Sequence, residues 1–228
     1  MSIFLHTHPY EPYNLEGATK LIVGTLPPPR FTTGALNDKD VDFCYGSSNG
    51  QLWPILDKIF DLGLVYENTH RAIEQRKHFL LSRKIGVCDI VASSERTKID
   101  ASDLGMQNVQ LRDIFGYLEA YPNIDTLLFT GGNSKNGPEY FFRRKAKEKN
   151  VPLHILSNEV PRIHSFTWAG REIKTVSLTA PSGAANRAVG SFALYKKMKS
   201  ENPKFTTCLL YTSPSPRDLS TSRMPSSA

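Results

Sequence analysis

Apolar and polar positions along most of this chain follow two different periods. Short apolar runs predict strands at residues 21–25, 85–91, 125–130 and 151–156, and a hairpin over 166–178 that turns at Ala169 and Gly170. Apolar residues three or four positions apart predict helices that begin near Pro54, over 69–84, around residues 111–118, over 141–149 and before Ser200. Strands that alternate with helices indicate an α/β fold. We expect a three-layer αβα sandwich with a central, mostly parallel four-stranded sheet.

Several segments lack a sustained period. Residues 1–17 predict an irregular arm, so we place an N-terminal arm at 1–19 and one domain at 20–207. Polar loops are expected at 30–42 and at 93–96. His6 and His8, two positions apart, would share one side of a strand and suit a metal ion, but without a third ligand the surface arm is the favoured interpretation. The helical period favours a core position for Trp53 over a base-stacking platform.

Composition limits the classes of protein that need to be considered. The chain has 228 residues, of which 39% are hydrophobic and 22% are charged, as in soluble globular domains. We expect a cytoplasmic protein, because no apolar run approaches the roughly 18 residues of a membrane helix and no signal pattern opens the chain. Cys44, Cys88 and Cys208 are widely spaced, which argues against a disulfide framework, a zinc site or an iron–sulfur cluster. The net charge of +6 favours, weakly, an anionic partner such as nucleic acid.

The last segment, residues 208–228, differs from the rest of the chain. Its two ends resemble a translated transposase-end sequencing adapter and a translated flow-cell adapter, so we expect it to be non-native. It contains Arg217, Arg223 and Asp218, and its removal changes the net charge from +6 to +5. Genomic DNA that encoded the same residues after Thr207 would contradict this interpretation.

Four small, polar loops follow the ends of predicted strands: 24–29 with 45–50, 89–96, 130–133 and 180–187. They contain no nucleophile with a partner base, no phosphate-binding P-loop and no set of metal ligands. Their glycines let backbone N–H groups approach a ligand, and Tyr45 supplies a ring for stacking. The loops therefore suit hydrogen-bond recognition of a flat polar group.

Five motifs in these loops occur in an order that resembles the uracil-DNA glycosylase superfamily. They are GTLPP at 24–28, YG…N…W at 45–53, D-x-V…S-x-R at 89–96, F-x-GG at 129–132 and PS-x-x-A-N at 181–186. The resemblance covers residues 20–199 and is greatest for the deoxyinosine (hypoxanthine) DNA glycosylase branch. It implies a monomeric, monofunctional enzyme that flips a deaminated base, hypoxanthine or uracil, out of DNA and hydrolyses its N-glycosidic bond. No metal or other cofactor is implied, since fixed hydrogen-bond donors and a positioned water suffice.

The resemblance also implies a role for each loop. Asn49 and Thr25 would be catalytic, with Asn49 orienting the water, and Tyr45 would stack on the flipped base. The residues implied to bind the substrate are Gly24, Leu26, Pro27, Tyr45, Asp89, Thr130, Gly131 and Asn133. The residues implied to bind DNA are Arg96, Pro181, Ser182, Gly183, Asn186 and Arg187.

Three departures from the family pattern bear on these roles. Counted back from Trp53, the family's asparagine falls on Gly50, one residue after Asn49. Thr130 stands where the superfamily often has asparagine, which leaves the preferred base open. Ala180 replaces the histidine of uracil-specific branches, which favours the deoxyinosine branch.

Other interpretations stay open. Asn49 and Asn186 also suit turns or caps, Asp89 suits a purely structural contact with backbone amides, and Tyr45 suits the edge of a core. Two other functions use the same loops: hydrolysis of free damaged nucleosides or nucleotides, and binding of DNA without catalysis.

Overall fold

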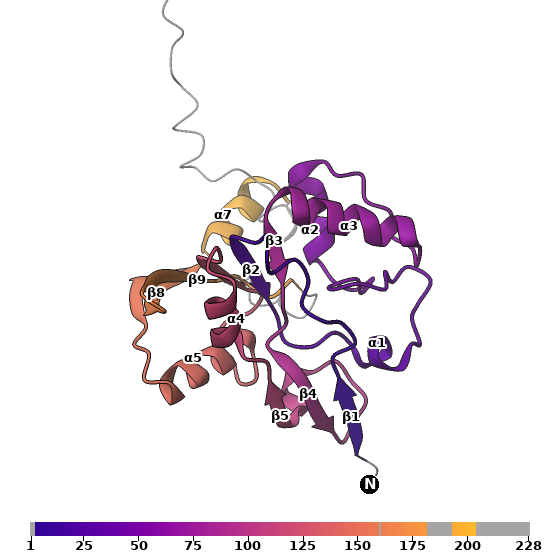
Figure 1. Cartoon of the computed structure of the whole chain (residues 1–228). Helices are drawn as coiled ribbons and strands as arrows, with labels where there is room; N and C mark the ends of the chain where they lie inside the picture. The colour runs from indigo at the N-terminus through magenta and orange to yellow at the C-terminus, as the bar shows by residue number, and fades with distance from the viewer. Residues whose placement is uncertain (1–2, 160, 182–192, 204–228) are drawn as a thin grey trace, which may run out of the picture. The chain divides into compact units, whose positions relative to one another are not determined.

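A six-stranded sheet runs through the larger part of this computed structural model, in the order β3-β2-β6-β9-β8-β7. The structure describes residues 3–159, 161–181 and 193–203. The chain divides into two compact units, one of residues 1–50 and 64–181 and the other of residues 51–63 and 182–228. Figure 1 labels the elements along the chain.

The first four strands of this sheet are parallel. They are β3 (Ile85–Val87), β2 (Lys20–Val23), β6 (Thr126–Phe129) and β9 (Arg171–Ser177). Two antiparallel strands, β8 (Arg162–Trp168) and β7 (His154–Ser157), complete the sheet on one side. The predicted α/β class with a central, mostly parallel sheet is confirmed. The run 151–156 does not supply the fourth parallel strand, because the predicted β8–β9 hairpin returns the chain between β6 and β7.

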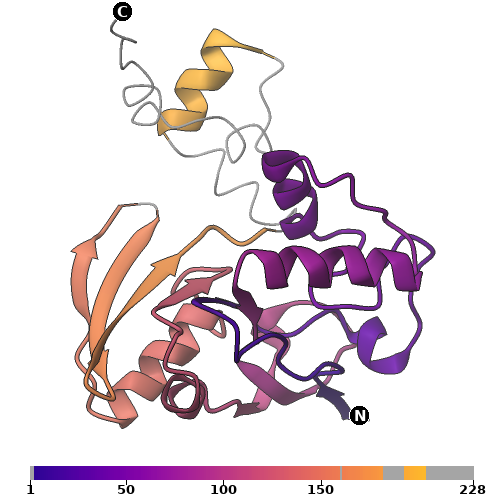
Figure 2. The same cartoon turned by 45° about the horizontal axis from the view of Figure 1, so that its top comes forward.

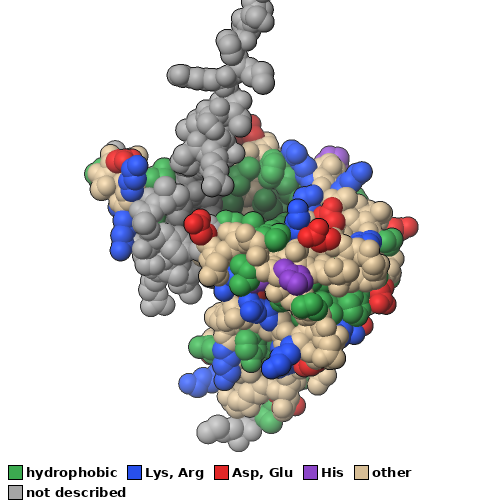
Figure 3. Space-filling model, turned by 90° about the vertical axis from the view of Figure 1, so that its left-hand side faces the viewer, with side chains coloured by type: hydrophobic (Ala, Val, Ile, Leu, Met, Phe, Trp, Pro, Cys, Tyr) green, Lys and Arg blue, Asp and Glu red, His purple; other side chains and the backbone are tan. Residues whose placement is uncertain are grey.

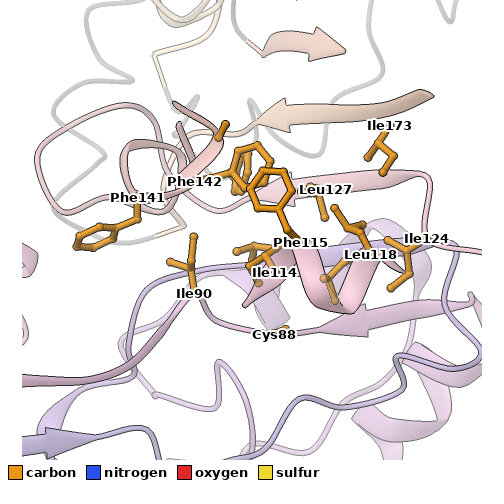
Figure 4. Close-up of a cluster of buried hydrophobic side chains, with 14 of the residues drawn as sticks. Cys88, Ile90, Ile114, Phe115, Leu118, Ile124, Leu127, Phe141, Phe142 and Ile173 are labelled. Atoms are coloured by element: carbon orange, nitrogen blue, oxygen red, sulfur yellow. The ribbon is translucent and has the colours of Figure 1, made fainter. Parts of the chain in front are cut away.

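Two helices cover one face of this sheet. They are α4 (Ile114–Ala120) and α5 (Pro138–Glu148), both predicted from the spacing of apolar residues. Because Leu21 pairs with Leu127 and Val23 with Phe129, buried apolar side chains of β2 and β6 form adjacent rows toward these helices. Figure 4 shows how Phe115 of α4 and Phe142 of α5 meet above the strands, with ring centroids 5.1 Å apart. This core fixes the strands whose ends carry the predicted loops.

Two further helices of the larger unit precede β3. The predicted helix at 69–84 is α3 (His70–Ser82), whose first turn is capped because the Thr69 hydroxyl accepts a hydrogen bond from the backbone N–H of Ala72. The segment 30–42, predicted to be a polar loop, begins instead with a short helix, α1 (Pro29–Thr33), and this prediction was wrong over these residues. Proline at the first helical position favours the helix, and Gly34, with φ of 73°, ends it.

A second sheet of three antiparallel strands corrects two other predictions. It contains β1 (Phe4–Thr7), β4 (Val91–Arg96) and β5 (Gln107–Leu111), in the order β1-β4-β5. The expected irregular arm therefore contains a strand, and the expected polar loop at 93–96 is a strand. The apolar pattern missed both because the buried side chains of these strands include His6, Ser94 and Arg96. A short 3₁₀ helix, η1 (Asp103–Gly105), lies in the loop between β4 and β5.

The smaller unit contains two described helices, α2 (Leu52–Phe60) and α7 (Ala193–Glu201), which are purple and yellow-orange in Figure 2. Both were predicted from the sequence, and Trp53 is buried as expected, with 2% of its surface exposed. No helix in the described part of the chain is long and apolar enough to cross a membrane. The segment 208–228 lies outside the described residues, and the domain boundaries at 20 and 207 stay predictions.

Candidate active site at the carboxyl ends of the parallel strands

The carboxyl end of β2 lies at the point where the strand order of the sheet reverses. From β2 the chain passes to β3 on one side, and the next strand of this sheet, β6, pairs with β2 on the other side. In open α/β sheets, ligands bind outside the strand ends at such a switch point. Backbone hydrogen bonds continue past the strands here, from Thr130 N to Val23 O at 2.9 Å and from Ile90 N to Gly24 O at 2.9 Å. Three predicted loops therefore start side by side.

Four residues from these loops form one hydrogen-bonded group, which we call the strand-end cluster: Gly24, Tyr45, Asp89 and Thr130. Asp89 Oδ1 accepts hydrogen bonds from the backbone N–H of Gly24 at 3.0 Å and from the Tyr45 hydroxyl at 2.9 Å. The Tyr45 hydroxyl lies 3.2 Å from Thr130 Oγ1. Since the Tyr45 proton points to Asp89, Thr130 is the donor in this last contact. The sequence had singled out all four residues, each in a different motif.

Position 24 requires glycine, because the other side chains of the strand-end cluster lie very close to its backbone. A Cβ atom there would lie 2.3 Å from the Tyr45 hydroxyl and 2.7 Å from Asp89 Oδ1, well inside van der Waals contact. The absence of a side chain is what allows the backbone of the β2 turn to approach the Asp89 carboxylate.

The environment of Tyr45 keeps its hydroxyl protonated. Burial, and then the negative charge of Asp89, raise the pKa of Tyr45 well above its usual range. The residue as a whole is partly exposed, and its backbone has φ of 59°, in the left-handed region. A protonated hydroxyl is a permanent donor to Asp89, so this contact persists at every physiological pH.

The loop that carries Tyr45 is held by a buried ion pair that sequence analysis did not identify. Asp40, fully buried, accepts hydrogen bonds from Arg30 Nε at 2.6 Å and Nη2 at 2.9 Å. It also accepts one from the backbone N–H of Ser48 at 2.7 Å. Burial alone would raise the pKa of Asp40, but these hydrogen bonds outweigh it and hold the pKa well below its usual range. The loop 40–48 is thus fixed around one carboxylate.

Thr25, predicted to be catalytic, contacts a residue that the sequence did not mark. The Thr25 hydroxyl donates to Asp103 Oδ1 at 3.0 Å. Asn136, in the loop after β6, donates from Nδ2 to Asp103 O at 2.9 Å and to Met106 O at 3.3 Å. Asp103 and Asn136 lie in loops without periodic pattern or motif, so only the fold reveals that they meet the β2 turn.

Burial raises the pKa of Asp103 to about 6. The hydrogen bond from Thr25 and the positive charge of Arg96 lower the pKa, and the charge of Asp89 raises it further. The Asp103 carboxyl group is therefore ionised at neutral pH but protonated in mild acid.

The two N-terminal histidines are buried at this site. His8 Nε2 lies 3.0 Å from Asp89 Oδ2, and His6 Nδ1 accepts a hydrogen bond from Arg96 Nε at 2.8 Å. The favoured interpretation of His6 and His8 as part of a surface arm was wrong, because β1 places His6 in the interior and the His8 side chain, directly after β1, is 4% exposed. The described residues contain no group of three or more His, Cys, Asp and Glu side chains able to hold a metal ion.

Arg96, predicted to bind DNA, is 2% exposed, and its guanidinium group also donates to Ser102 O at 2.6 Å. Its described contacts all lie within the protein, and they connect β4 with β1 and with the loop that carries Asp103. Burial is the main reason that the pKa of Arg96 is lowered. Its role in binding DNA stays a prediction.

The other predicted residues lie apart from these contacts. Asn49 is exposed, and no described hydrogen bond involves its side chain, while Gly131 is buried after β6. Asn133 is exposed and lines an open hollow of about 790 Å³ with the basic residues of α5, including Arg144 and Lys147. Leu26 packs against the core, and Pro27 and Pro181 are partly buried. The remaining predicted DNA-binding residues lie outside the described residues: Ser182, Gly183, Asn186 and Arg187.

Comparison with known proteins gives one match, to a solved structure. No protein-family model and no curated protein matches the chain. The matching structure is a solution NMR structure of a protein from Methanosarcina acetivorans described as a "putative Uracil DNA glycosylase". The alignment covers 92% of this chain and 98% of that one, with a TM-score of 0.51 and 16% sequence identity. The two chains share a fold. At this identity the likeness concerns the fold alone.

Proposed function

We propose that this chain is a monofunctional DNA glycosylase that flips a deaminated base, hypoxanthine or uracil, out of DNA and hydrolyses its N-glycosidic bond. The observation that carries the proposal is the strand-end cluster. Gly24, Tyr45, Asp89 and Thr130 come from four separate motifs of the resemblance, and hydrogen bonds join them at the switch point of the sheet. The fold shared with a structure described as a "putative Uracil DNA glycosylase" supports the same function.

The polar groups of this site suit the charges that develop when a base leaves deoxyribose. The base gains negative charge and the sugar gains positive charge, so the reaction requires fixed donors near the base and a positioned water near the sugar. In the proposal, Thr130, Gly131 and Asn133 recognise the base edge and the ring of Tyr45 stacks on the base. Gly24, Leu26 and Pro27 border the base, and Thr25 and Asn49 position the water.

The proposed contacts with DNA come from Arg96 and from residues 181–187. On the described part of the face in Figure 3, basic and acidic side chains lie interspersed. Charge on that face therefore does not mark a path for the phosphate backbone. The proposed residues are Arg96, Pro181, Ser182, Gly183, Asn186 and Arg187.

The test is base release from duplex oligonucleotides that each contain one hypoxanthine, uracil or xanthine, followed by alkaline cleavage of the abasic product. We expect cleavage at hypoxanthine or uracil and no strand cleavage before alkali, as a monofunctional enzyme gives. An Asp89→Ala preparation, purified in parallel, controls for glycosylases from the expression host.

Two outcomes would contradict the proposal. Faster hydrolysis of free deoxyinosine or deoxyuridine than of the oligonucleotides would indicate a nucleoside hydrolase. Salt-dependent DNA binding without any base release would indicate a non-catalytic DNA-binding protein. Loss of base release in Asn49→Ala would support the proposed water-orienting role of Asn49. Unchanged base release in this variant would contradict that role.

A further inference from the structure

The turn after β2 contains a single polar side chain. Its sequence, Gly-Thr-Leu-Pro-Pro-Pro over residues 24–29, includes no carboxylate, amide or imidazole group. Thr25 is therefore the one side chain of this turn that can hydrogen bond, and its hydroxyl donates to Asp103. A hydroxyl with an ordinary pKa cannot take a proton from water, whereas a carboxylate can.

Two other parts of the fold fix Asp103 beside this turn. Asn136, from the loop after β6, holds the backbone carbonyl of Asp103 at 2.9 Å. Arg96, from β4, bonds to Ser102 O at 2.6 Å, which holds the residue before Asp103. Asp103 itself begins the short 3₁₀ helix η1. Asp103 is thus held by its side chain, by its backbone carbonyl and by the preceding residue, from the turn after β2, the loop after β6 and β4 respectively.

We propose that Asp103 is the catalytic carboxylate that takes the proton from the attacking water in the glycosylase reaction. This inference rests on the proposed function and names a residue outside the motifs of the family resemblance. Thr25 is then a positioning residue that orients Asp103 Oδ1, and Asn136 is a positioning residue that holds its backbone.

The proposed step forms one bond to C1′ and breaks another. The water oxygen forms a bond to C1′ of deoxyribose, while the bond between C1′ and the base nitrogen breaks and its electron pair stays on the base. One proton of the water remains on the new sugar hydroxyl, and the other passes to Asp103. Asp103 later releases this proton to solvent, and the departing base takes up one proton from solvent.

Asp103 is better placed for this step than Asp89 or Asn49. Both oxygens of Asp89 are engaged, by Gly24 and Tyr45 on one side and His8 on the other. Among the described residues, Thr25 alone hydrogen bonds to the Asp103 carboxylate, which leaves Oδ2 able to accept a proton. An amide such as that of Asn49 can orient water but cannot accept its proton.

The charges around Asp103 also suit a general base, a group that accepts the proton of the water, at neutral pH. Arg96 and Asp89 face it from β4 and from the end of β3, and Asp100 lies in its own loop. Burial raises the pKa of Asp103 to about 6, so the group is ionised at pH 7 yet more basic than an exposed carboxylate. Ionisation near this value predicts activity that rises with pH and reaches a plateau above it.

The test compares Asp103→Asn with Asp38→Asn in the full chain, by single-turnover base release from the best lesion oligonucleotide. Asn retains the hydrogen bond from Thr25 but cannot accept a proton. We expect Asp103→Asn to lower the rate constant by about 10²–10⁴-fold, with DNA affinity unchanged within about twofold. Asp38, an exposed aspartate outside these contacts, is the control for loss of one negative charge, and Asp38→Asn should leave the rate unchanged within about twofold.

The pH profile and a second pair of variants separate catalysis from structure. The unaltered chain should lose activity as pH falls through about 6, and the residual activity of Asp103→Asn should lack this limb. Thr25→Ser should keep most activity and Thr25→Val should lose it, if the hydroxyl orients Asp103.

Base release by Asp103→Asn at the unaltered rate would overturn the inference while the proposed function stands. Absence of release by the unaltered chain from every lesion would contradict the proposed function, and the role of Asp103 with it.

Discussion

At Asp89, one carboxylate joins three parts of the chain that are far apart in sequence. It accepts hydrogen bonds from Gly24, Tyr45 and His8, which are 65, 44 and 81 residues away. Hydrogen bonds to a charged acceptor each contribute about 1.5–3 kcal/mol, and more is lost when a buried acceptor is left unpaired. The strand-end cluster is thus a stabilising feature as well as a candidate site.

Tyr45→Phe separates these two roles of the tyrosine. The variant keeps the ring but removes the hydroxyl that donates to Asp89, so we expect the free energy of unfolding to fall by about 1–3 kcal/mol. Base release should persist in Tyr45→Phe, because stacking needs only the ring. Tyr45→Ala should lower both the stability and the rate of base release. Urea denaturation and single-turnover base release measure the two quantities. Equal loss of activity in the Phe and Ala variants would contradict a stacking role.

Two buried groups on either side of Arg96 have pKa shifts of opposite sign. Burial, with the nearby charge of Arg96, lowers the pKa of His6 from 6.5 to about 4, and burial raises that of Asp103 from 3.8 to about 6. The contribution of His6 to stability is complete above about pH 6.5 and is lost as pH falls toward 4. The contribution of Asp103 is complete below about pH 4 and is lost as pH rises through 6. Between these values the two effects oppose each other.

Asp103→Asn should therefore raise stability at neutral pH. Near pH 4 the native carboxyl group is protonated and resembles the amide, so the variant and the unaltered chain should unfold at similar urea concentrations. Near pH 7 the variant should be more stable by up to about 3 kcal/mol, because it avoids burying a negative charge. A variant that is more stable yet catalytically impaired fits a carboxylate retained for chemistry. Lower stability of the variant near pH 7 would show that the ionised carboxylate stabilises the fold.

At the scale of elements, β4 shows where prediction from sequence fails. Apolar runs located β2 and β6 because their buried positions are filled by Leu, Ile, Val and Phe. The buried positions of β4 include Ser94 and Arg96, and the pairing of β4 with β5 is interrupted by two register shifts. The burial of Arg96 depends on a hydrogen bond to His6, which lies 90 residues earlier in the chain. A local sequence pattern cannot reveal such a distant partner.

The candidate site likewise contains residues that could be predicted from the sequence and residues that could not. Gly24, Tyr45, Asp89 and Thr130 could be singled out because each lies in a recognisable motif, and all but Tyr45 also come just after a predicted strand or at its end. Asp103 and Asn136 could not, since their importance comes from contacts between loops 33 residues apart that have no period of their own. The contact of His8 with the site was missed because its partner, Asp89, lies 81 residues away.

Arg171, at the start of β9, hydrogen bonds to the end of α4 and to the segment that follows it. Arg171 Nη1 donates to the carbonyl oxygens of Pro122 and Ile124, and its Nη2 donates to Leu118 O. The Leu118 carbonyl lies in the last turn of α4, where carbonyl groups have no partner within the helix, so the hydrogen bond from Nη2 satisfies it. The two bonds from Nη1 hold the segment that follows the helix.

Arg171→Ala should lower the free energy of unfolding by about 2–3 kcal/mol, because three carbonyl groups lose a charged donor. Thermal unfolding followed by circular dichroism measures the effect, expected as a fall in Tm of about 4–12 °C. Glu172→Ala, exposed on the same strand, is the control and should change the free energy of unfolding by less than about 0.5 kcal/mol. Equal effects of the two variants would show that the arginine does not stabilise α4.

At the scale of the whole molecule, the proposed encounter with DNA depends on net charge. The chain carries 28 Lys and Arg residues against 22 Asp and Glu residues. Phosphate contacts release bound counterions, so we expect the Kd for lesion DNA to rise at least about tenfold between about 50 and 200 mM salt. The rate of base release from the saturated complex should stay constant, because the chemistry does not change the number of phosphate contacts. Fluorescence anisotropy and single-turnover assays at matched salt test both statements, and a salt-independent Kd would argue against a phosphate-binding surface.

The pairing of β1 with β4 sets the order in which a growing polypeptide can complete this site. Residues 4–7 leave the ribosome first, but their partners are residues 93–96. At about 5–20 residues per second, the N-terminal strand waits roughly 5–20 seconds for its neighbour to be synthesised. His8 therefore reaches Asp89 only after β2 and β3 have been translated. At the N-terminus, therefore, β1 takes its place in the sheet only after elements that are synthesised later, β2 and β3, have been made.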